Sequence, residues 1–434
     1  MNSNSTGERQ TKSSLFYGWW IVGVCFILLF FYAGSGFYSF SIFIKPLENQ
    51  FGWSRAEVSL TMSIYFFVTG LVSPLIGQLC QSFGPKKIMF FGALGTGACF
   101  ILVSFTRSLG YFYVVYAVIA LAISGIGFVP VSSLLARWFV SRRGAAIGLA
   151  YIGVSVGGLM LAPIVGFMTS RFNWQSAYIF MGISLWILAL PTIWRIVKSD
   201  PRDAGLRPDG QAASPEWSSN SNGGNEAPEP SPPQDWPLKP ALKSRAFRWI
   251  TVTFFLAPMA QMGVLQHQVP LIMDRGVSAE TAATALGLIA GMGGLGKLIF
   301  GRMSDSLPFH WVAALCFGMQ ALGVLILLGP DSIILIWLYV AVFGFGMGGV
   351  IVLQPLAIGK FFGVTAFGVI LGVGHLIHAL GASIGAYTSG WIYDTFGDYR
   401  YALTTFILMY LAAIVSIFLA GRPSPYTPGE GVSP

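Results

Sequence analysis

Twelve apolar runs, separated by short polar or charged stretches, dominate the chain. Each run can form a helix of about 20 residues, the length that crosses the hydrocarbon of a bilayer. The first run follows a polar leader and has no small-residue cleavage site after it, so we expect it to remain as a helix and not to act as a signal peptide. The predicted spans are 17–43, 56–80, 86–106, 110–136, 144–169, 175–194, 249–273, 279–301, 310–329, 333–358, 364–392 and 400–421.

The composition makes lipid the expected solvent. Of the 434 residues, 54% are hydrophobic and 10% are charged, whereas a soluble domain carries about 25% charged residues. A surface so poor in charge excludes a cytosolic enzyme and a nucleic-acid-binding protein. The cysteines lie inside apolar runs, without the close spacing of a metal knuckle or a disulfide framework, so we expect buried reduced thiols. They are Cys25, Cys80, Cys99 and Cys316.

The net charge is +8, and nearly all of the Lys and Arg residues lie outside the spans. An even number of spans puts both termini on one side, and Lys and Arg concentrate on the cytoplasmic side of a membrane protein. Eighteen of the 25 Lys and Arg residues fall on the side of the termini, six fall on the other side, and Lys297 lies within a span. The sequence therefore predicts a multi-pass protein of the inner membrane with cytoplasmic termini, and the basic charge needs no nucleic acid to explain it.

Residues 200–245 separate two halves of the chain. They are rich in Pro, Ser, Asn and Gly and nearly free of aliphatic side chains, which predicts a flexible cytoplasmic linker. A shift of 224 residues superimposes the two halves without a gap, so that Pro46 meets Pro270 and Gly70 meets Gly294. Further pairs at the same shift are Gly148 with Gly372, Gly157 with Gly381 and Gly166 with Gly390.

This repeat determines the expected architecture. Six spans is an even number, so the halves are parallel repeats related by an axis along the membrane normal, and matched glycines let helix backbones approach closely. Glycine is common in membrane helices, but the aligned prolines argue against chance. We expect an all-α membrane protein of two pseudo-symmetric six-helix bundles, suited to alternating access. The predicted segments are a leader at 1–15, a first bundle at 16–199, the linker at 200–245, a second bundle at 246–422 and a cytoplasmic tail at 423–434.

Two loops resemble the major facilitator superfamily, and the resemblance covers the chain apart from the leader and the linker. GQLCQSFGPKK at 77–87 is similar to that family's loop between spans 2 and 3, with Gln81 and Ser82 in place of the usual Asp-Arg pair. GRMSD at 301–305 repeats the start of that loop and keeps the acid. The resemblance implies a secondary transporter and makes Asp305 a candidate gating residue.

Other stretches are similar to the monocarboxylate transporters and their bacterial oxalate/formate antiporter relatives. FYGWWIV at 16–22 opens span 1, and WFVSRRGAAIGLA at 138–150 enters span 5 with the aromatic, basic and small residues of those proteins in order. SIFIKPL at 41–47, followed by FGWSR at 51–55, also resembles bacterial members. This resemblance implies that the substrate is a small carboxylate.

Ionisable groups within the hydrocarbon are few, and each is costly enough to suggest a function. Lys297 lies in span 8, four residues before Gly301, where the monocarboxylate family has an arginine, so the resemblance implies that Lys297 binds the substrate carboxylate. Its ammonium favours a small anion over a neutral or cationic solute. The alternative is a snorkelling lysine, because Arg302 marks the interface and five residues put Lys297 only about 7.5 Å deep. The family acid one turn earlier is Gly293 here, so no permanent Lys-carboxylate pair is expected in that place.

Three histidines also lie deep in the spans. His267 lies in a polar patch near the outer end of span 7 and is a candidate for gating or proton relay, or else an interfacial histidine bound to water. His375 and His378 lie three residues apart on one face of span 11. That spacing also suits a metal pair, but no third ligand lies near them in sequence, so we expect no metal. A proton or anion role and simple packing are the two remaining interpretations.

Polar and aromatic side chains on the helices expected to line the cavity complete the candidate site. They can donate hydrogen bonds to a carboxylate, although most such side chains only pack. No cofactor is expected, since the glycine-rich segment at 344–349 lies within a span and lacks the strand and the Lys-Ser/Thr of a phosphate-binding loop. The candidates for substrate binding are Tyr32, Tyr38, Tyr116, Tyr151 and Gln354.

The sequence thus favours a secondary transporter of a small organic anion, most simply a monocarboxylate such as lactate or pyruvate moved with a proton. Anion exchange of the oxalate/formate type is the alternative, because it needs only the cationic site; two cationic sites would favour a dicarboxylate. Efflux of cationic drugs is disfavoured because no Asp or Glu lies deep in a span, and a receptor or scaffold because the outer loops are short. The expected partners are the substrate, a proton or counter-anion and the bilayer, and the protein is expected to be a monomer and not an enzyme.

Overall fold

The computed structural model describes residues 16–139, 142–207, 236–363 and 367–421. Within these ranges every regular element is a helix, and twelve helical segments are long and apolar enough to cross a membrane. The chain is therefore a multi-pass membrane protein with twelve spans, as the apolar runs predict.

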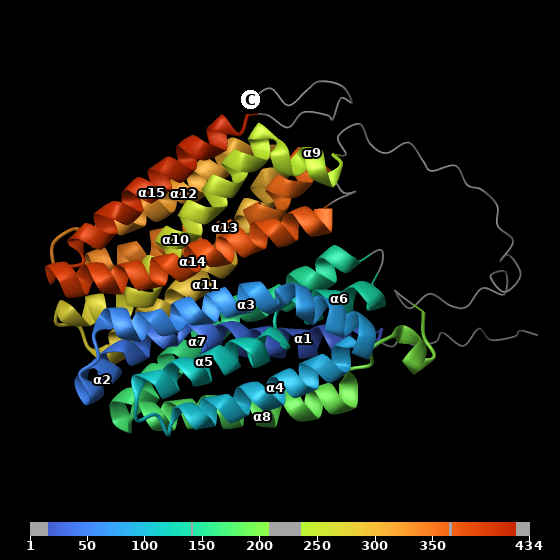
Figure 1. The fold of residues 1–434 in the computed structure, drawn as a ribbon, viewed down its shortest axis with the longest axis horizontal. Coiled ribbons are helices and arrows are strands. Elements are labelled where there is room, and N and C mark those ends of the chain that lie inside the picture. The colour runs from blue at the N-terminus through green and yellow to red at the C-terminus, as the bar shows by residue number, and fades with distance from the viewer. Residues whose placement is uncertain (1–15, 140–141, 208–235, 364–366, 422–434) are drawn as a thin grey trace, which may run out of the picture.

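The spans form two bundles that lie side by side (Figure 1). This arrangement confirms the predicted all-α fold. The N-terminal bundle consists of α1 (Gly18–Ala33), η1 (Gly34–Tyr38), α2 (Phe40–Phe51), α3 (Arg55–Phe83), α4 (Pro85–Val103), α5 (Leu109–Ser124), α6 (Phe128–Trp138), α7 (Arg143–Arg171) and α8 (Trp174–Ile196). The C-terminal bundle consists of α10 (Arg245–Asp274), α11 (Ala279–Ser306), α12 (Phe309–Leu327), α13 (Ile333–Phe362), α14 (Phe367–Phe396) and α15 (Arg400–Leu419).

The same helix pairs pack in both bundles. Helix α1 packs on α7 as α10 packs on α14, and α3 packs on α5 as α11 packs on α13. The glycines matched by the repeat lie at these crossings. A Cβ added at Gly157 would be 2.1 Å from the carbonyl oxygen of Phe30, and one added at Gly381 would be 2.3 Å from that of Phe255. Only glycine fits where these helix backbones touch.

Two predicted spans differ from the helices observed. The predicted end of span 1 at residue 43 is wrong, because the chain continues through the π-helix η1 into α2, which ends at Phe51. The polar residues that suggest an end, Lys45 and Glu48, bind charged partners at the bundle interface instead. The predicted single helix over 110–136 is interrupted between α5 and α6, where Gly125 packs against the backbone of α4.

Short helices occupy both ends of the predicted linker. The 3₁₀-helix η2 (Pro201–Ala204) follows α8, and α9 (Leu238–Lys243) precedes α10. The N–H of Trp236 donates to the carbonyl oxygen of Phe362 at 3.0 Å, so this end of the segment contacts the C-terminal bundle. The middle of the predicted linker lies outside the described ranges, as do the predicted leader at 1–15 and tail at 423–434. The four cysteines are buried and free, as expected.

Two faces of the molecule are defined by the helix ends. We call the terminal face the one where α1 and α10 begin and where α8 and α15 end, at the right of Figure 1. The opposite face carries the loops that precede α3, α11 and α15. Helix α3 packs along α14 and α7 packs along α11, and these two seams join the bundles.

Candidate functional site

A cluster of charged residues joins the bundles at the opposite face. The guanidinium of Arg55, at the start of α3, donates to both carboxylate oxygens of Asp274, at the end of α10, at 2.6 and 3.2 Å. Lys45 binds the same carboxylate at 2.5 Å, and Glu48 accepts from Arg55 at 3.2 Å. The Arg55 side chain is only 3% exposed, so solvent screens its ion pair less than it would a surface pair. We call these four residues the latch.

Asp394 of α14 adds a second link between the bundles. Its carboxylate accepts the backbone N–H groups of Arg55 at 3.1 Å and of Ala56 at 2.7 Å. These are the first residues of α3, whose N–H groups have no partner within the helix. A carboxylate from the C-terminal bundle therefore caps a helix of the N-terminal bundle, where a negative charge also interacts favourably with the helix dipole.

Tyr399 connects the latch to His267. The Arg55 guanidinium donates to the Tyr399 hydroxyl at 2.9 Å, and that hydroxyl lies 3.0 Å from Nδ1 of His267. On its other side, Nε2 of His267 lies 2.7 Å from the hydroxyl of Ser59 and 3.1 Å from the carbonyl oxygen of Ala386. His267 belongs to α10 and Ser59 to α3, so the imidazole also bridges the two bundles.

The partners of His267 select one tautomer. A carbonyl oxygen only accepts, so the hydrogen of the neutral ring lies on Nε2, toward Ala386. Nδ1 then accepts from Tyr399, whose hydroxyl is protonated because burial raises its pKa above the usual range. Tyr399 accepts from Arg55, which has no acceptor atom. A proton added to Nδ1 would turn a second donor toward Tyr399, so this arrangement fits only the neutral ring.

Toward the terminal face, the two seams touch at small residues. A Cβ added at Gly70 would lie 2.8 Å from Cβ of Ala379, and one added at Gly294 would lie 3.1 Å from Cβ of Ser155. The repeat relates Gly70 to Gly294 and Ser155 to Ala379, so these two junctions are equivalent positions of the two halves.

Lys297 of α11 lies at one of these junctions. Its ammonium donates to the hydroxyl of Ser155 at 2.8 Å, across the bundle interface. Among the described residues, no carboxylate oxygen lies within 4.0 Å of this ammonium. An ammonium has three N–H donors, so two are left for a ligand. Between described residues, no hydrogen bond or ion pair joins the bundles on the terminal side of this bond.

A small cavity lies between the bundles in the terminal half. Its volume of about 40 Å³ has room for a few water molecules. Helices α1 and α3, the break between α5 and α6, and α14 all contribute to its wall, so two predicted candidates, Tyr32 and His375, share it. The lining residues are Tyr32, Thr69, Ser73, Ile76, Ser124, Gly127, Phe128, Val129 and His375.

Aromatic rings connect this cavity with the neighbourhood of Lys297. The ring centroid of Phe128 lies 5.2 Å from that of Tyr32 and 4.9 Å from that of Tyr151. The Tyr151 hydroxyl hydrogen-bonds to Ser132 at 2.9 Å, and Tyr151 lies one turn before Ser155 on α7. The structure thus brings Tyr151 and Tyr32 to the same part of the interface.

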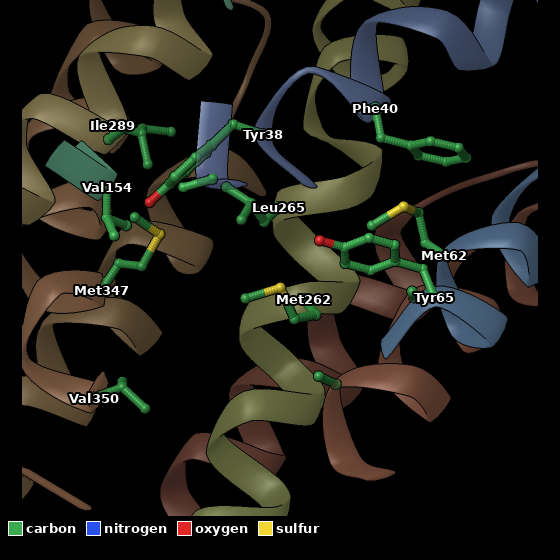
Figure 2. Packing of buried hydrophobic residues seen from close by; sticks show 14 of the residues in the cluster. Tyr38, Phe40, Met62, Tyr65, Val154, Met262, Leu265, Ile289, Met347 and Val350 are labelled. Atoms are coloured by element: carbon green, nitrogen blue, oxygen red, sulfur yellow. The ribbon is translucent and has the colours of Figure 1, made fainter. Parts of the chain in front are cut away.

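Tyr38 ends the π-helix and lies at the bundle interface. A Cβ added at Gly158 of α7 would be 2.7 Å from its ring. Figure 2 shows its hydroxyl directed toward Val154 of α7 and Met347 of α13. Gly348, which follows Met347 on α13, packs against the backbone nitrogen of Lys297. The Cβ added at Gly158 would also lie 2.4 Å from Cβ of Ala290, so the Tyr38 ring lies beside α11 about two turns before Lys297.

Two polar atoms between α13 and α14 are buried without a partner among the described residues. They are Nε2 of Gln354 and Nδ1 of His378. A Cβ added at Gly374, one turn before His378, would lie 3.3 Å from the Gln354 nitrogen. The rings of His375 and His378 stack with centroids 5.7 Å apart. An unpartnered buried polar atom costs free energy, so these positions suit a ligand or water. No group of three metal-ligating side chains occurs in the described ranges.

Tyr116 and Asp305 lie apart from the other candidates. The Tyr116 hydroxyl bonds to that of Tyr178, and its ring packs against Phe40 and Phe112, all within the N-terminal bundle. This is the packing of a core residue, and it does not bring Tyr116 to the interface between the bundles, where a substrate-binding residue is expected. Asp305 lies in the last turn of α11, and its side chain falls outside the described part of the chain.

The latch is not evident from the pattern of the sequence. The pattern identifies Lys45 and Arg55 only as basic residues at the ends of spans. A signal was present nonetheless, because Arg55 is a positive charge at the first residue of a helix and Asp274 a negative charge at the last residue of another. Each charge opposes the dipole of its own helix and therefore needs a partner elsewhere.

Two bundles of six spans that touch at small residues and close at one face have the architecture of a secondary transporter. The sequence comparisons agree with this class. The chain belongs to the Major Facilitator Superfamily, whose sequence profile matches residues 24–386 and 269–434.

Individual relatives are distant but span most of the chain. An uncharacterized MFS-type transporter of Bacillus subtilis, YcxA, is 25% identical in an alignment of 395 positions that covers 87% of this chain and 90% of that protein. Monocarboxylate transporter 12 of Mus musculus is 24% identical and covers 93% of this chain and 85% of its own. The crystal structure of a bacterial homolog of the human lysosomal transporter Spinster, inward-facing and unoccupied, has a TM-score of 0.73 at 15% identity and covers 96% of this chain and 100% of its own.

Proposed function

We propose that this protein transports small organic anions, and that its substrate is a monocarboxylate of the lactate or pyruvate kind moved with a proton. The observation that carries the proposal is the ammonium of Lys297 at the bundle interface, which among the described residues has two unused donors and no carboxylate partner. A cation in a medium of low dielectric constant favours an anion. Its bond to Ser155 across the interface argues against a lysine that snorkels to the terminal face. The relatives named as monocarboxylate transporters support the same substrate class.

We further propose that the terminal face is cytoplasmic and that the membrane is the inner membrane, because Lys and Arg concentrate on that side. The latch then closes the outer face of a monomer with bundles at 16–199 and 246–422. Impermeant maleimide added to intact cells should label the Gly110→Cys variant and not the Lys87→Cys variant. The reverse labelling would contradict this orientation.

His267 is our candidate for proton coupling. The closed latch fits the neutral ring, so a proton that enters from the opposite face and binds Nδ1 would turn Tyr399 away and loosen the hold of Arg55. The other charged groups around Arg55 are Asp274, Lys45, Glu48 and Asp394. A His267→Gln variant should keep anion exchange and lose the acceleration by an inward proton gradient. His375, His378 and Asp305 stay as secondary candidates for a proton or gating role.

Anion exchange of the oxalate/formate type is the second candidate. The lack of a carboxylate within 4.0 Å of Lys297 among the described residues favours it, because exchange needs a cationic site and no acid to carry a proton. Uptake that requires an internal counter-anion and ignores the proton gradient would support exchange over symport.

The deciding experiment is uptake into proteoliposomes. Labelled lactate, pyruvate, acetate, formate and oxalate are compared with and without an inward proton gradient, for the wild type, Lys297→Ala and Lys297→Arg. Lys239→Ala, which removes an exposed lysine, is the control. Gradient-driven uptake that is lost in Lys297→Ala and kept in the control would support the proposal. Normal uptake by Lys297→Ala would refute the site.

A further inference from the structure

The hydroxyl of Ser155 has an unused hydrogen at the point where Lys297 reaches the other bundle. Ser155 is 3% exposed. Its oxygen accepts from the Lys297 ammonium at 2.8 Å, and its own hydrogen has no acceptor among the described residues. Ser170 on the same helix donates to the backbone carbonyl of Gly166 one turn earlier at 3.0 Å, and Ser73 of α3 donates to that of Thr69 at 2.7 Å. Ser155 has no such bond, so its hydrogen is available to a ligand.

The repeat shows that the hydroxyl is not needed for packing. At the equivalent junction of the other seam, Ala379 takes the place of Ser155 and meets Gly70 at nearly the same separation as Ser155 meets Gly294. The residue that corresponds to Lys297 is Ser73, which has no charge. One of two equivalent junctions thus carries an ammonium and a hydroxyl, and the other closes with an alanine methyl.

We propose that Ser155 is a substrate-binding residue, and that its O–H together with the Lys297 ammonium holds one carboxylate between the bundles. This inference rests on the proposed transport of carboxylates. One ammonium hydrogen keeps the bond to Ser155, a second donates to one carboxylate oxygen, and the Ser155 hydrogen donates to the other. Hydrogen bonds that involve an ionised group are roughly twice as strong as neutral ones, so each donor contributes substantially to affinity.

The two donors come from different bundles, since Lys297 belongs to α11 and Ser155 to α7. A carboxylate held by both is bound fully only while this junction is formed. Substrate binding would therefore stabilise the contact between α7 and α11, and the empty protein would have only the single bond between the two side chains.

The test compares Ser155→Ala with the matched control Ala379→Ser, which adds a hydroxyl at the equivalent junction. Uptake of labelled pyruvate by proteoliposomes gives KM and the maximal rate, and the pyruvate-dependent rise of Tm in detergent gives an apparent Kd. Loss of one hydrogen bond to the carboxylate should raise both KM and Kd about tenfold in Ser155→Ala. The maximal rate should change less than twofold, and Ala379→Ser should match the wild type.

Several results would overturn the inference. KM and Kd within twofold of wild type in Ser155→Ala would show that the hydroxyl does not touch the substrate. A lower maximal rate with unchanged KM and Kd would assign Ser155 to the bundle contact alone. If Lys297→Ala also transported pyruvate normally, the binding site at Lys297 would fail as a whole, and if the wild type took up no carboxylate, the proposed function itself would fail. Both results differ from an error confined to Ser155, in which wild-type uptake is present and is lost in Lys297→Ala.

Discussion

Arg55 and Asp274 lie 219 positions apart in the sequence and form a two-point ion pair at 2.6 and 3.2 Å. Arg55 belongs to the N-terminal bundle and Asp274 to the C-terminal bundle, so the pair exists only when the opposite face is closed. The closed state is therefore stabilised by charges remote from Lys297, so substitutions in the latch should alter the conformational preference and leave the proposed substrate site at Lys297 unchanged.

Asp274→Asn should shift the protein toward a state open at the opposite face. The substitution removes the two-point ion pair across the bundles and leaves the buried Arg55 guanidinium with Glu48 of its own bundle as its counter-charge. The loss costs about 1–3 kcal/mol and changes the ratio of states by roughly tenfold. Spin labels at Arg107→Cys and Pro330→Cys lie in loops of the two bundles at the opposite face. Their distance, measured by double electron–electron resonance, should increase when this face opens. Glu280→Gln is the control, because its ion pair with Arg171 spans 3.9 Å between side chains 49% and 67% exposed and should contribute little. An equal shift in both variants would contradict the role of the latch.

Tyr399→Phe should destabilise the protein and act through His267. The change removes one hydroxyl that accepts from Arg55 and donates to Nδ1 of His267, at a cost of about 1–3 kcal/mol in the free energy of unfolding. A double-mutant cycle with His267→Phe, read from denaturation midpoints, should give a coupling of about 0.5–3 kcal/mol because both residues belong to one network. Additive effects would show that Tyr399 and His267 act independently.

Gly157→Ala should destabilise the N-terminal bundle. Its added Cβ would lie 2.1 Å from the Phe30 carbonyl oxygen, and overpacking costs about 1–3 kcal/mol. Gly148→Ala is a control on the same helix, since nothing lies within 4 Å of its added Cβ, and the better helix propensity of alanine should leave its Tm unchanged or raised. Gly381→Ala and Gly372→Ala should repeat this contrast in the other bundle. Equal Tm values for Gly157→Ala and Gly148→Ala would argue against the close helix crossing.

Gln354→Leu should weaken transport without lowering the stability of the protein. The amide nitrogen of Gln354 is buried and has no partner among the described residues, so its removal should leave Tm unchanged or raise it. If the amide donates to the substrate, KM for pyruvate should rise at the same time. A lower Tm with an unchanged KM would instead make Gln354 a packing residue.

Periodicity and the repeat predict the fold because they act over the whole chain. Spans need about 20 apolar residues wherever they occur, and the matched glycines mark helix crossings in both halves. The α5–α6 break is missed, because a Gly-Ile-Gly segment reads as an ordinary part of an apolar run until Gly125 is seen against α4. Local pattern carries no information about such a neighbour.

The site is predicted less completely, since its main contacts join distant segments. An ionisable group within a span stands out in sequence, which is why Lys297 and His267 are found. Ser155 and Tyr399 are ordinary residue types for a membrane helix or a loop, and only the three-dimensional arrangement reveals their partners. The repeat does not help at the latch, because the position equivalent to Arg55 is Ala279.

The cap that Asp394 forms on α3 has a consequence for the resting orientation of the protein. Opening of the opposite face would remove the Asp394 carboxylate and leave the backbone N–H groups of Arg55 and Ala56 to be rehydrated, while Ser54 would still cap the N–H of Glu57. A helix cap is worth about 0.5–2 kcal/mol, equivalent to a population ratio of about 2- to 30-fold. A substitution of Asp394 should therefore change which orientation predominates in the absence of substrate. The residues proposed to bind the solute would stay unchanged.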